Sequence, residues 1–300
     1  MSAAPFLRGS IVALLTPMTP DENIDFVALQ RLVELHVDAG TSAIVVASTT
    51  GEGPTLSLDE HALLYRSVLQ YSAGRIPVIA GVGSPATHVA CELAREAGHE
   101  GVDAILCVTP YYNRPNDVGL RRHFTAVAEA TDTPVILYDV PHRTGVSLSE
   151  NLIVALSGHP NIVGLKDATG DLPRAIRLLA SVGPDFQIFS GDDSSAFGLM
   201  VAGGAGVISV AANIAPSAVR AMCDAVRRGD IQEGARMDEA LRPLYEFLCV
   251  DSNPIPAKWL ANKIGWMNST LRSPLVMPPD LFRHLSEGVV SNVPQDLLGY

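Results

Sequence analysis

Residues 134–138 read Pro-Val-Ile-Leu-Tyr, and residues 162–166 read Ile-Val-Gly-Leu-Lys. Each is a short, mostly apolar run that ends in a polar side chain, a pattern typical of a strand buried on both faces. Amphipathic stretches separate these runs from one another, so the sequence predicts alternating strands and helices and a parallel sheet. Six further runs of the same kind lie at 11–15, 43–47, 77–80, 104–108, 186–190 and 206–210.

Eight such units favour a closed (β/α)8 (TIM) barrel over a doubly wound open sheet. The strand pattern stops near Pro216, and helical patterns follow it. We therefore expect residues 1–220 to form the barrel. Residues 221–300 are expected to form an α-helical C-terminal region packed on the barrel, because no low-complexity linker separates the two parts.

Serines and glycines mark where several of the helices should begin and end. Ser57 stands three residues before Glu60 and Ser149 precedes an apolar helical stretch, as is usual for residues that cap a helix start. Glycine favours the turn that follows a helix. The expected helix ends are Gly40, Gly98 and Gly158.

The composition is that of a water-soluble globular chain. Its 300 residues are 47% hydrophobic and 18% charged, which excludes disorder, collagen and a coiled coil. The formal net charge is −11, from 21 basic and 32 acidic residues. Such a charge repels phosphate groups, so we expect no nucleic-acid partner.

The chain carries no signal for a membrane or for an oxidising compartment. Its four cysteines have no metal-type spacing and most lie in apolar patterns, so we expect buried free thiols. The first ten residues lack the features of a signal peptide, which favours the cytoplasm. The longest apolar tract, residues 197–216, is broken by glycines, so we expect no membrane span.

In a TIM barrel the catalytic groups stand at the carboxyl ends of the strands. One such end is Lys166, and the chain has two other lysines, Lys258 and Lys263. Lysine is rarely buried, and removal from water favours its neutral amine, which can form a Schiff base with a carbonyl compound. The position alone is equally compatible with an ion pair to Asp167 or Glu52, or with a side chain that reaches solvent.

Other groups near the strand ends could serve the same site. Tyr138 could move protons during imine formation, although a tyrosine at a strand end is more often a packing residue. Thr49 and Thr50 could relay protons or bind a carboxylate, but they suit a simple turn equally well. Arg143 offers a planar fork for a carboxylate, although a solvated surface arginine is the commoner case.

Three other features are not expected to bind ligands. Residues 81–86 resemble a dinucleotide-binding turn, but Asp103 precedes the next strand instead of following it. The glycine-rich residues 203–206 precede the last strand, which places them at the opposite face. The eight histidines include no HxH or HExxH pattern, so we expect no metal and no other cofactor.

Seven segments, spread along almost the whole chain, resemble segments of one known protein family. They are Ser-Thr-Thr-Gly-Glu (48–52), Thr-Pro-Tyr-Tyr-Asn-Arg-Pro (109–115), Tyr-Asp-Val-Pro-His-Arg-Thr-Gly (138–145), Gly-Leu-Lys-Asp-Ala-Thr-Gly (164–170), Ser-Gly-Asp-Asp (190–193), Gly-Val-Ile-Ser-Val (206–210) and Asn-Pro-Ile-Pro-Ala-Lys (253–258). Together they resemble the dihydrodipicolinate synthase family, within the pyruvate-dependent class I aldolases. The resemblance implies a lyase that condenses pyruvate with aspartate 4-semialdehyde to 4-hydroxy-tetrahydrodipicolinate, for lysine and diaminopimelate biosynthesis.

The resemblance also implies catalytic roles for individual residues. Lys166 would form the pyruvate imine, so no further cofactor would be needed, and Tyr138 would donate and accept protons there. Thr49 would link Tyr138 to Tyr112. Tyr112 would complete the site of a neighbouring subunit, which implies a dimer at least and a homotetramer, a dimer of dimers, as the expected assembly.

The same resemblance implies the groups that bind substrate. Thr50, with the backbone of Gly191 and Ile208, would hold the pyruvate end. Arg143 would bind the carboxylate of aspartate semialdehyde. The arginine loop and the Tyr-Tyr-Asn-Arg-Pro segment favour the synthase over the related sialic-acid and sugar-acid aldolases, which generally lack both.

At two positions the sequence departs from the usual pattern of the family, which keeps other activities open. Ser48 stands where glycine is usual, and Asp139 stands where asparagine is usual. An aldolase, lyase or hydratase-aldolase for another 2-oxo acid is the alternative enzyme. A barrel that binds a small molecule without catalysis is the alternative from another class, and the complete set of candidate catalytic residues argues against it.

A third departure concerns regulation. In feedback-inhibited members of the family, lysine binds through polar residues, and here Leu58, Pro85 and Val89 cannot bind an ammonium or a carboxylate by their side chains. We therefore expect weak or absent inhibition by lysine. The matching positions are Gly53, Pro54, Leu58, His61, Pro85, Val89 and Tyr111.

Overall fold

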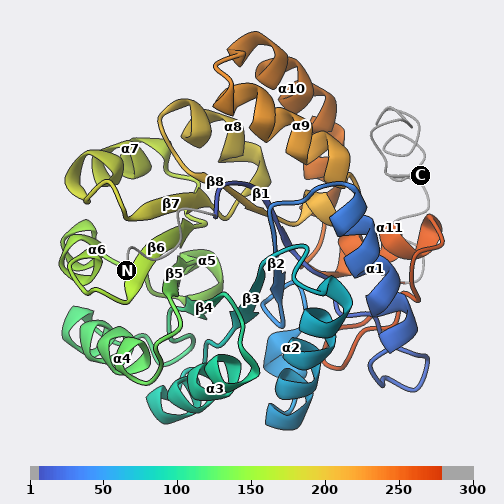
Figure 1. Ribbon diagram of the computed structural model, residues 1–300, viewed down its shortest axis with the longest axis horizontal. Coiled ribbons are helices and arrows are strands. Elements are labelled where there is room, and N and C mark those ends of the chain that lie inside the picture. The colour runs from blue at the N-terminus through green and yellow to red at the C-terminus, as the bar shows by residue number, and fades with distance from the viewer. Residues whose placement is uncertain (1–6, 279–300) are drawn as a thin grey trace.

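The computed structural model describes residues 7–278, and in them eight parallel strands close into a barrel, as predicted. Each strand pairs with the next along the chain, and the last pairs with the first. Figure 1 shows the strands at the centre of a ring of helices. The strands are β1 (Gly9–Ala13), β2 (Ala43–Val46), β3 (Val78–Gly81), β4 (Ala104–Val108), β5 (Val135–Asp139), β6 (Ile162–Asp167), β7 (Gln187–Ser190) and β8 (Gly206–Ser209).

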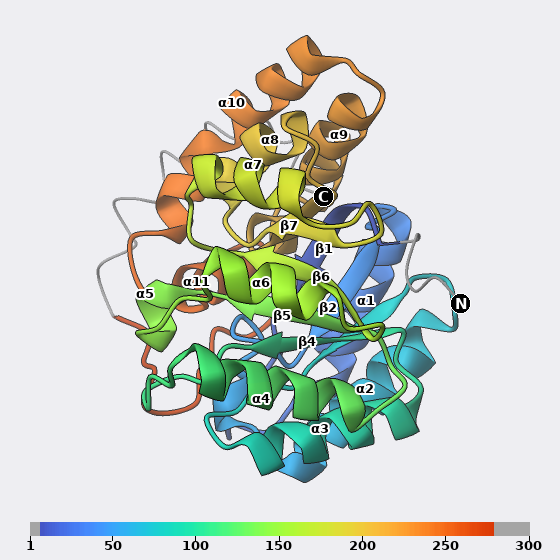
Figure 2. The same cartoon turned by 90° about the vertical axis from the view of Figure 1, so that its left-hand side faces the viewer.

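Helices follow the strands in the order that a (β/α)8 barrel requires, and β5 is followed by two. Seen from the side, the longer ones lie along the outside of the barrel, and α5 lies at one end of it (Figure 2). They are α1 (Phe26–Asp38), α2 (Leu58–Ser72), α3 (Thr87–Glu100), α4 (Asp117–Glu129), α5 (Pro141–Thr144), α6 (Glu150–Ser157), α7 (Leu172–Ser181), α8 (Asp193–Val201) and α9 (Pro216–Arg227), with α10 (Ile231–Leu248) and α11 (Ile255–Lys263) beyond the barrel order.

The predicted helix starts are confirmed, whereas one predicted end is wrong. Ser57 and Glu60 form a reciprocal capping box at the start of α2, and Ser149 caps α6. Helix α3 continues through Gly98 and ends before Gly101, whose φ of 86° suits glycine. Gly98 marks a close approach instead, because a Cβ there would stand 2.6 Å from Oγ1 of Thr131.

Two buried layers explain why the strand sequences are apolar on both faces. Inside the barrel, side chains such as Ile11, Val45 and Tyr138 pack together. Outside it, side chains such as Val12 and Leu137 pack against the helices. Three of the four cysteines are buried and free, as predicted, and Cys249 is exposed.

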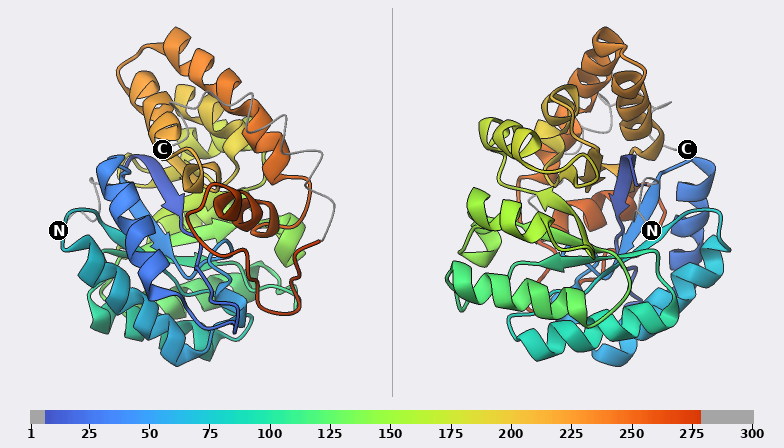
Figure 3. Two further views of the ribbon diagram at one scale, coloured as in Figure 1. Left: turned by 90° about the vertical axis from the view of Figure 1, so that its right-hand side faces the viewer. Right: turned by 60° about the vertical axis from the view of Figure 1, so that its left-hand side comes forward.

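The C-terminal region joins the barrel through α9. This helix follows β8, packs on β1 and runs from Pro216 to Arg227, so the expected division between residues 220 and 221 falls inside it. Helix α10 packs on α9, and α11 lies across the end of the barrel that carries α5 (Figures 2 and 3). Residues 279–300 of the expected region lie outside the described residues. No described helix is long and apolar enough to cross a membrane.

Candidate active site

Lys166 and Tyr138 meet at the ends of two neighbouring strands. They are paired in the register of β5 and β6, and both side chains are buried. The Nζ atom of Lys166 stands over the tyrosine ring, 4.2 Å from the ring centroid. The phenol of Tyr138 is thus the titratable group of β5 that lies next to the amine.

The two ion pairs proposed as alternatives for Lys166 are both absent, because each carboxylate has another partner. Asp167 is bound by Arg174, at 2.7 Å, and Glu52 pairs with Lys258. Within residues 7–278, no salt bridge to Lys166 is found. Its buried amine is therefore available for a carbonyl compound.

The loop after β2 brings two hydroxyl groups to the same end of the barrel. Ala47 and Glu52 adopt left-handed backbone conformations, with φ of 55° and 57°, and turn the chain sharply. Thr49 and Tyr138 line one small cavity of about 40 Å³, together with Tyr111. Burial raises the pKa of Tyr111 above its ordinary value.

Thr50 is buried and fixed from the C-terminal region. Its Oγ1 accepts a hydrogen bond from Nδ2 of Asn253, at 3.0 Å. The backbone carbonyl of Asn253 also accepts from the guanidinium of Arg143, at 3.2 Å. One residue thus connects a candidate pyruvate ligand with the candidate ligand of the second substrate.

Gly191 lies close to Lys166, and Ile208 lies in the inner layer of the barrel. The Gly191 backbone packs against the lysine side chain, since a Cβ there would stand 3.0 Å from Cγ and Cε of Lys166. Ile208 is fully buried in the same inner layer as Tyr138. Gly191 also lines a cavity of about 630 Å³, together with Arg143 and Asn253.

Tyr112 is the one candidate catalytic residue that a single chain does not bring to the others. Its side chain is 94% exposed, and its backbone has a φ of 73°. Its N–H donates to the carbonyl of Thr144, at 3.2 Å. A non-glycine residue held in this conformation is uncommon and is often found at functional sites.

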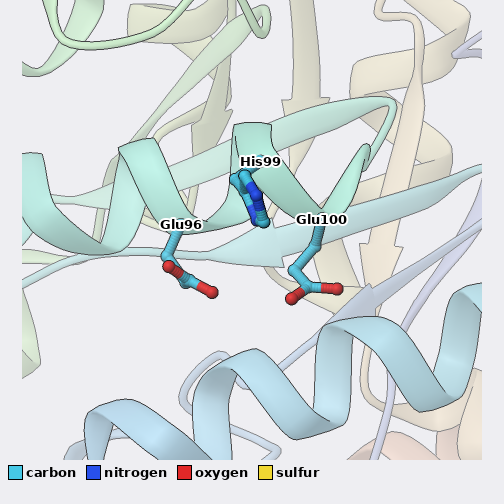
Figure 4. A group of neighbouring side chains, drawn as sticks. All are labelled: Glu96, His99 and Glu100. Atoms are coloured by element: carbon cyan, nitrogen blue, oxygen red, sulfur yellow. The ribbon is translucent and has the colours of Figure 1, made fainter.

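One group of side chains in the described residues could hold a metal ion, and it lies on the outer helix α3. Glu96, His99 and Glu100 place one ligand atom each within 4.8 Å of one another (Figure 4). However, the carboxylate of Glu100 is already bound by the guanidinium of Arg66. This group belongs to the protein surface and has no part in the barrel site.

Asn253 and Asp193 both lie in motifs that carry the resemblance, but the sequence predicted no role for either. The carboxylate of Asp193 accepts from the N–H groups of Val210 and Ala211, at 3.0 and 2.9 Å, and so joins the ends of β7 and β8. Burial raises its pKa. The repeated acid in Ser-Gly-Asp-Asp was the available signal, but nothing in the sequence shows which acid turns inward.

Comparisons with known proteins decide the family. The model of the dihydrodipicolinate synthetase family matches residues 6–280. The chain belongs to this family. The 4-hydroxy-tetrahydrodipicolinate synthase of Shewanella sp. strain MR-7 is 50% identical over 259 residues, which are 86% of this chain and 88% of the relative. That of Laribacter hongkongensis is 45% identical over 274 residues, 91% and 94% of the two chains.

A solved member of the dihydrodipicolinate synthetase family has the same fold. The chloride-inhibited dihydrodipicolinate synthase of Acinetobacter baumannii, crystallised with pyruvate, superimposes with a TM-score of 0.94 at 42% identity, over 95% of this chain and 98% of that one. The family expected from the sequence motifs is therefore confirmed, and so is the barrel.

Proposed function

We propose that this chain is a 4-hydroxy-tetrahydrodipicolinate synthase, which condenses pyruvate with aspartate 4-semialdehyde. The observation that carries the proposal is the buried Lys166 amine, in contact with the Tyr138 ring and without a carboxylate partner in the described residues. Close relatives carry the same name, and one related structure holds pyruvate. No metal or other cofactor enters the proposed reaction.

Pyruvate is first bound as an imine. The neutral amine of Lys166 attacks the keto carbon, and the phenol of Tyr138 protonates the hydroxyl group, which leaves as water. Thr50 and the backbone of Gly191 and Ile208 hold the pyruvate carboxylate. The product of this step is a pyruvate imine on Lys166.

The carbon–carbon bond forms in the second half of the reaction. Tyr138, deprotonated by the loss of water, takes a proton from the methyl group and turns the imine into an enamine. The enamine carbon attacks the aldehyde, and Tyr138 returns the proton to the oxygen of the former aldehyde. Thr49 connects Tyr138 to Tyr112 for the proton transfers. The amino group of the second substrate then displaces the Lys166 amine at the former keto carbon, which closes the ring and frees the enzyme.

Arg143 decides between this reaction and those of related aldolases. Its side chain lines the cavity of about 630 Å³ together with Gly191, whose backbone packs against Lys166, and its guanidinium donates to the Asn253 carbonyl. A planar fork in this place suits the carboxylate of aspartate semialdehyde. The reaction of a larger 2-oxo acid, such as a sugar acid, does not require a group that binds this carboxylate.

The proposal includes an assembly. The exposed Tyr112 has its role only if it enters the site of a neighbouring subunit, so we propose a dimer as the smallest active unit and a homotetramer as the complete enzyme. We further propose a cytoplasmic location and a division into a barrel, 1–220, and a packed helical region, 221–300, with α9 shared between the two.

Steady-state assays across acceptors test the proposed substrate. We expect turnover of pyruvate with aspartate semialdehyde, and little with sugar-acid or aromatic aldol substrates. An Arg143→Met variant should raise the KM for the semialdehyde and leave the KM for pyruvate unchanged. Faster turnover of a sugar acid or of an aromatic aldol would instead favour the alternative aldolase.

A further inference from the structure

A buried arginine joins the two strands that carry Lys166 and Tyr138. Arg174 extends from α7, and its side chain is 9% exposed. It donates to Asp139 on β5 and to Asp167 on β6, both at 2.7 Å. A further N–H donates to the carbonyl of Leu148, at 2.8 Å.

The two carboxylates directly follow the two candidate catalytic residues. Tyr138 is paired with Lys166, and Asp139 is paired with Asp167, in the register of β5 and β6. Side chains alternate between the faces of a strand. Tyr138 and Lys166 therefore face the inside of the barrel, while the aspartates face outward toward Arg174.

The pairing of β5 with β6 is irregular at the amino ends of these strands. Val135 is paired with Ile162, but the next residue of β5, Ile136, is paired with Gly164, so the register shifts by one residue. A shift of one residue turns side chains to the opposite face. Beyond the shift the register is regular over the four pairs from Ile136–Gly164 to Asp139–Asp167, so the relation of Tyr138 to Lys166 is set within this short carboxyl-terminal ladder and by the contacts at its end.

The buried cluster of Arg174, Asp139 and Asp167 has more acidic than basic groups. Two buried carboxylates share one guanidinium, and Oδ1 of Asp139 has no hydrogen-bond partner. Buried ion clusters are often no more stable than apolar side chains of the same size. A directional role at the strand ends, which apolar side chains cannot perform, accounts for the cluster better than stability does.

We propose that Arg174 is a positioning residue for catalysis. Its two charge-assisted hydrogen bonds hold the ends of β5 and β6 in register, which keeps the Lys166 amine against the Tyr138 ring. Arg174 itself does not contact the substrate. This inference rests on the proposed function, because it assigns Arg174 to the imine-forming step.

Timed borohydride trapping of pyruvate on Lys166 tests the proposal. An Arg174→Lys variant keeps the positive charge but loses the planar fork that reaches both carboxylates. An Arg174→Met/Asp139→Asn/Asp167→Asn variant removes all three charges, so that no buried carboxylate is left unpaired. We expect both to trap pyruvate about 10- to 100-fold more slowly at saturating pyruvate, because small misplacements of reacting groups have effects of this size.

Two controls separate positioning from general damage. Arg177→Met removes an exposed arginine of the same helix, paired with Glu150, and should trap at the wild-type rate. Asp139→Asn keeps a neutral acceptor for Arg174 and should therefore slow trapping less than Arg174→Lys does. Circular dichroism and thermal unfolding establish that each variant is folded.

The outcomes are distinct. Wild-type trapping rates in the folded Arg174→Lys variant, or in the folded triple variant, would overturn the positioning role and leave the proposed function intact. Slow trapping with an unchanged KM for pyruvate supports it. A wild-type chain that gives no adduct on Lys166 would overturn both the proposed function and this inference.

Discussion

The amide of Asn253 donates a hydrogen bond to the hydroxyl oxygen of Thr50, at 3.0 Å, across 203 residues of sequence. A hydroxyl group that already accepts a bond has its own hydrogen free to donate. In the proposed enzyme that hydrogen points to the pyruvate carboxylate. The buried ion pair between Lys258 and Glu52 holds the same two segments together.

Asn253→Ala should weaken the use of pyruvate. Loss of the donor leaves the Thr50 hydroxyl without its fixed orientation, and we expect about a five- to tenfold fall in kcat/KM for pyruvate. Asn253→Asp removes the same donor and should behave similarly. The exposed Asn262→Ala on α11 serves as the control. In a Thr50→Val background the Asn253→Ala change should lower kcat/KM no further. If the effects of the two changes on kcat/KM were fully additive, Asn253 would not act through Thr50.

Mixed assemblies test whether Tyr112 acts in the neighbouring site. Lys166→Ala and Tyr112→Phe chains are each expected to have little activity alone. Co-assembled, they form pairs in which one site holds an intact Lys166 and receives an intact Tyr112 from the other subunit. We expect activity to reappear on mixing. If mixing restores nothing, Tyr112 does not act across the interface.

Lysine should inhibit this enzyme weakly or not at all. His61 keeps its polar character, but its two ring nitrogens are engaged with the Tyr65 hydroxyl and the Gly53 carbonyl, at 2.9 and 3.1 Å. The apolar Leu58 and Val89 offer no replacement. Initial rates measured with and without millimolar lysine check this, and a rate halved by lysine would refute it.

The extra carboxylate at Asp139 should make stability depend on pH. Burial raises the pKa of Asp139, although the charge of Arg174 opposes the shift. The folded chain then binds this proton more tightly than the unfolded chain, so stability falls as the pH rises from about 4 through the folded pKa. Relative to wild type, Asp139→Asn should gain in Tm toward neutral pH. A difference in Tm that is independent of pH would contradict this.

The sequence was sufficient to predict the barrel and to predict that Lys166 and Tyr138 lie close together. Apolar runs identify the strands, and parallel strands in a barrel bring their carboxyl ends together. Strand bounds were less accurate: the first was expected at 11–15, whereas β1 spans Gly9–Ala13. Leu14 and Leu15 are as buried as the strand itself, so apolarity alone could not separate them from it.

The contacts that support the site could not be predicted. Asn253 reaches Thr50 only because the C-terminal region folds back over the barrel end, and no local pattern encodes that contact. The shared binding of Arg174 by Asp139 and Asp167 depends on the register of β5 and β6. That register shifts within the strands, which an apolar run does not reveal.

Reductive trapping of pyruvate tests the central claim most directly. The chain has three lysines, Lys166, Lys258 and Lys263, so an adduct can be located without ambiguity by peptide mass spectrometry. After incubation with pyruvate and borohydride, the adduct should lie on Lys166, and Lys166→Ala should give none. An adduct on Lys258, on Lys263 or on the N-terminal amine alone, or no adduct at all, would contradict the account.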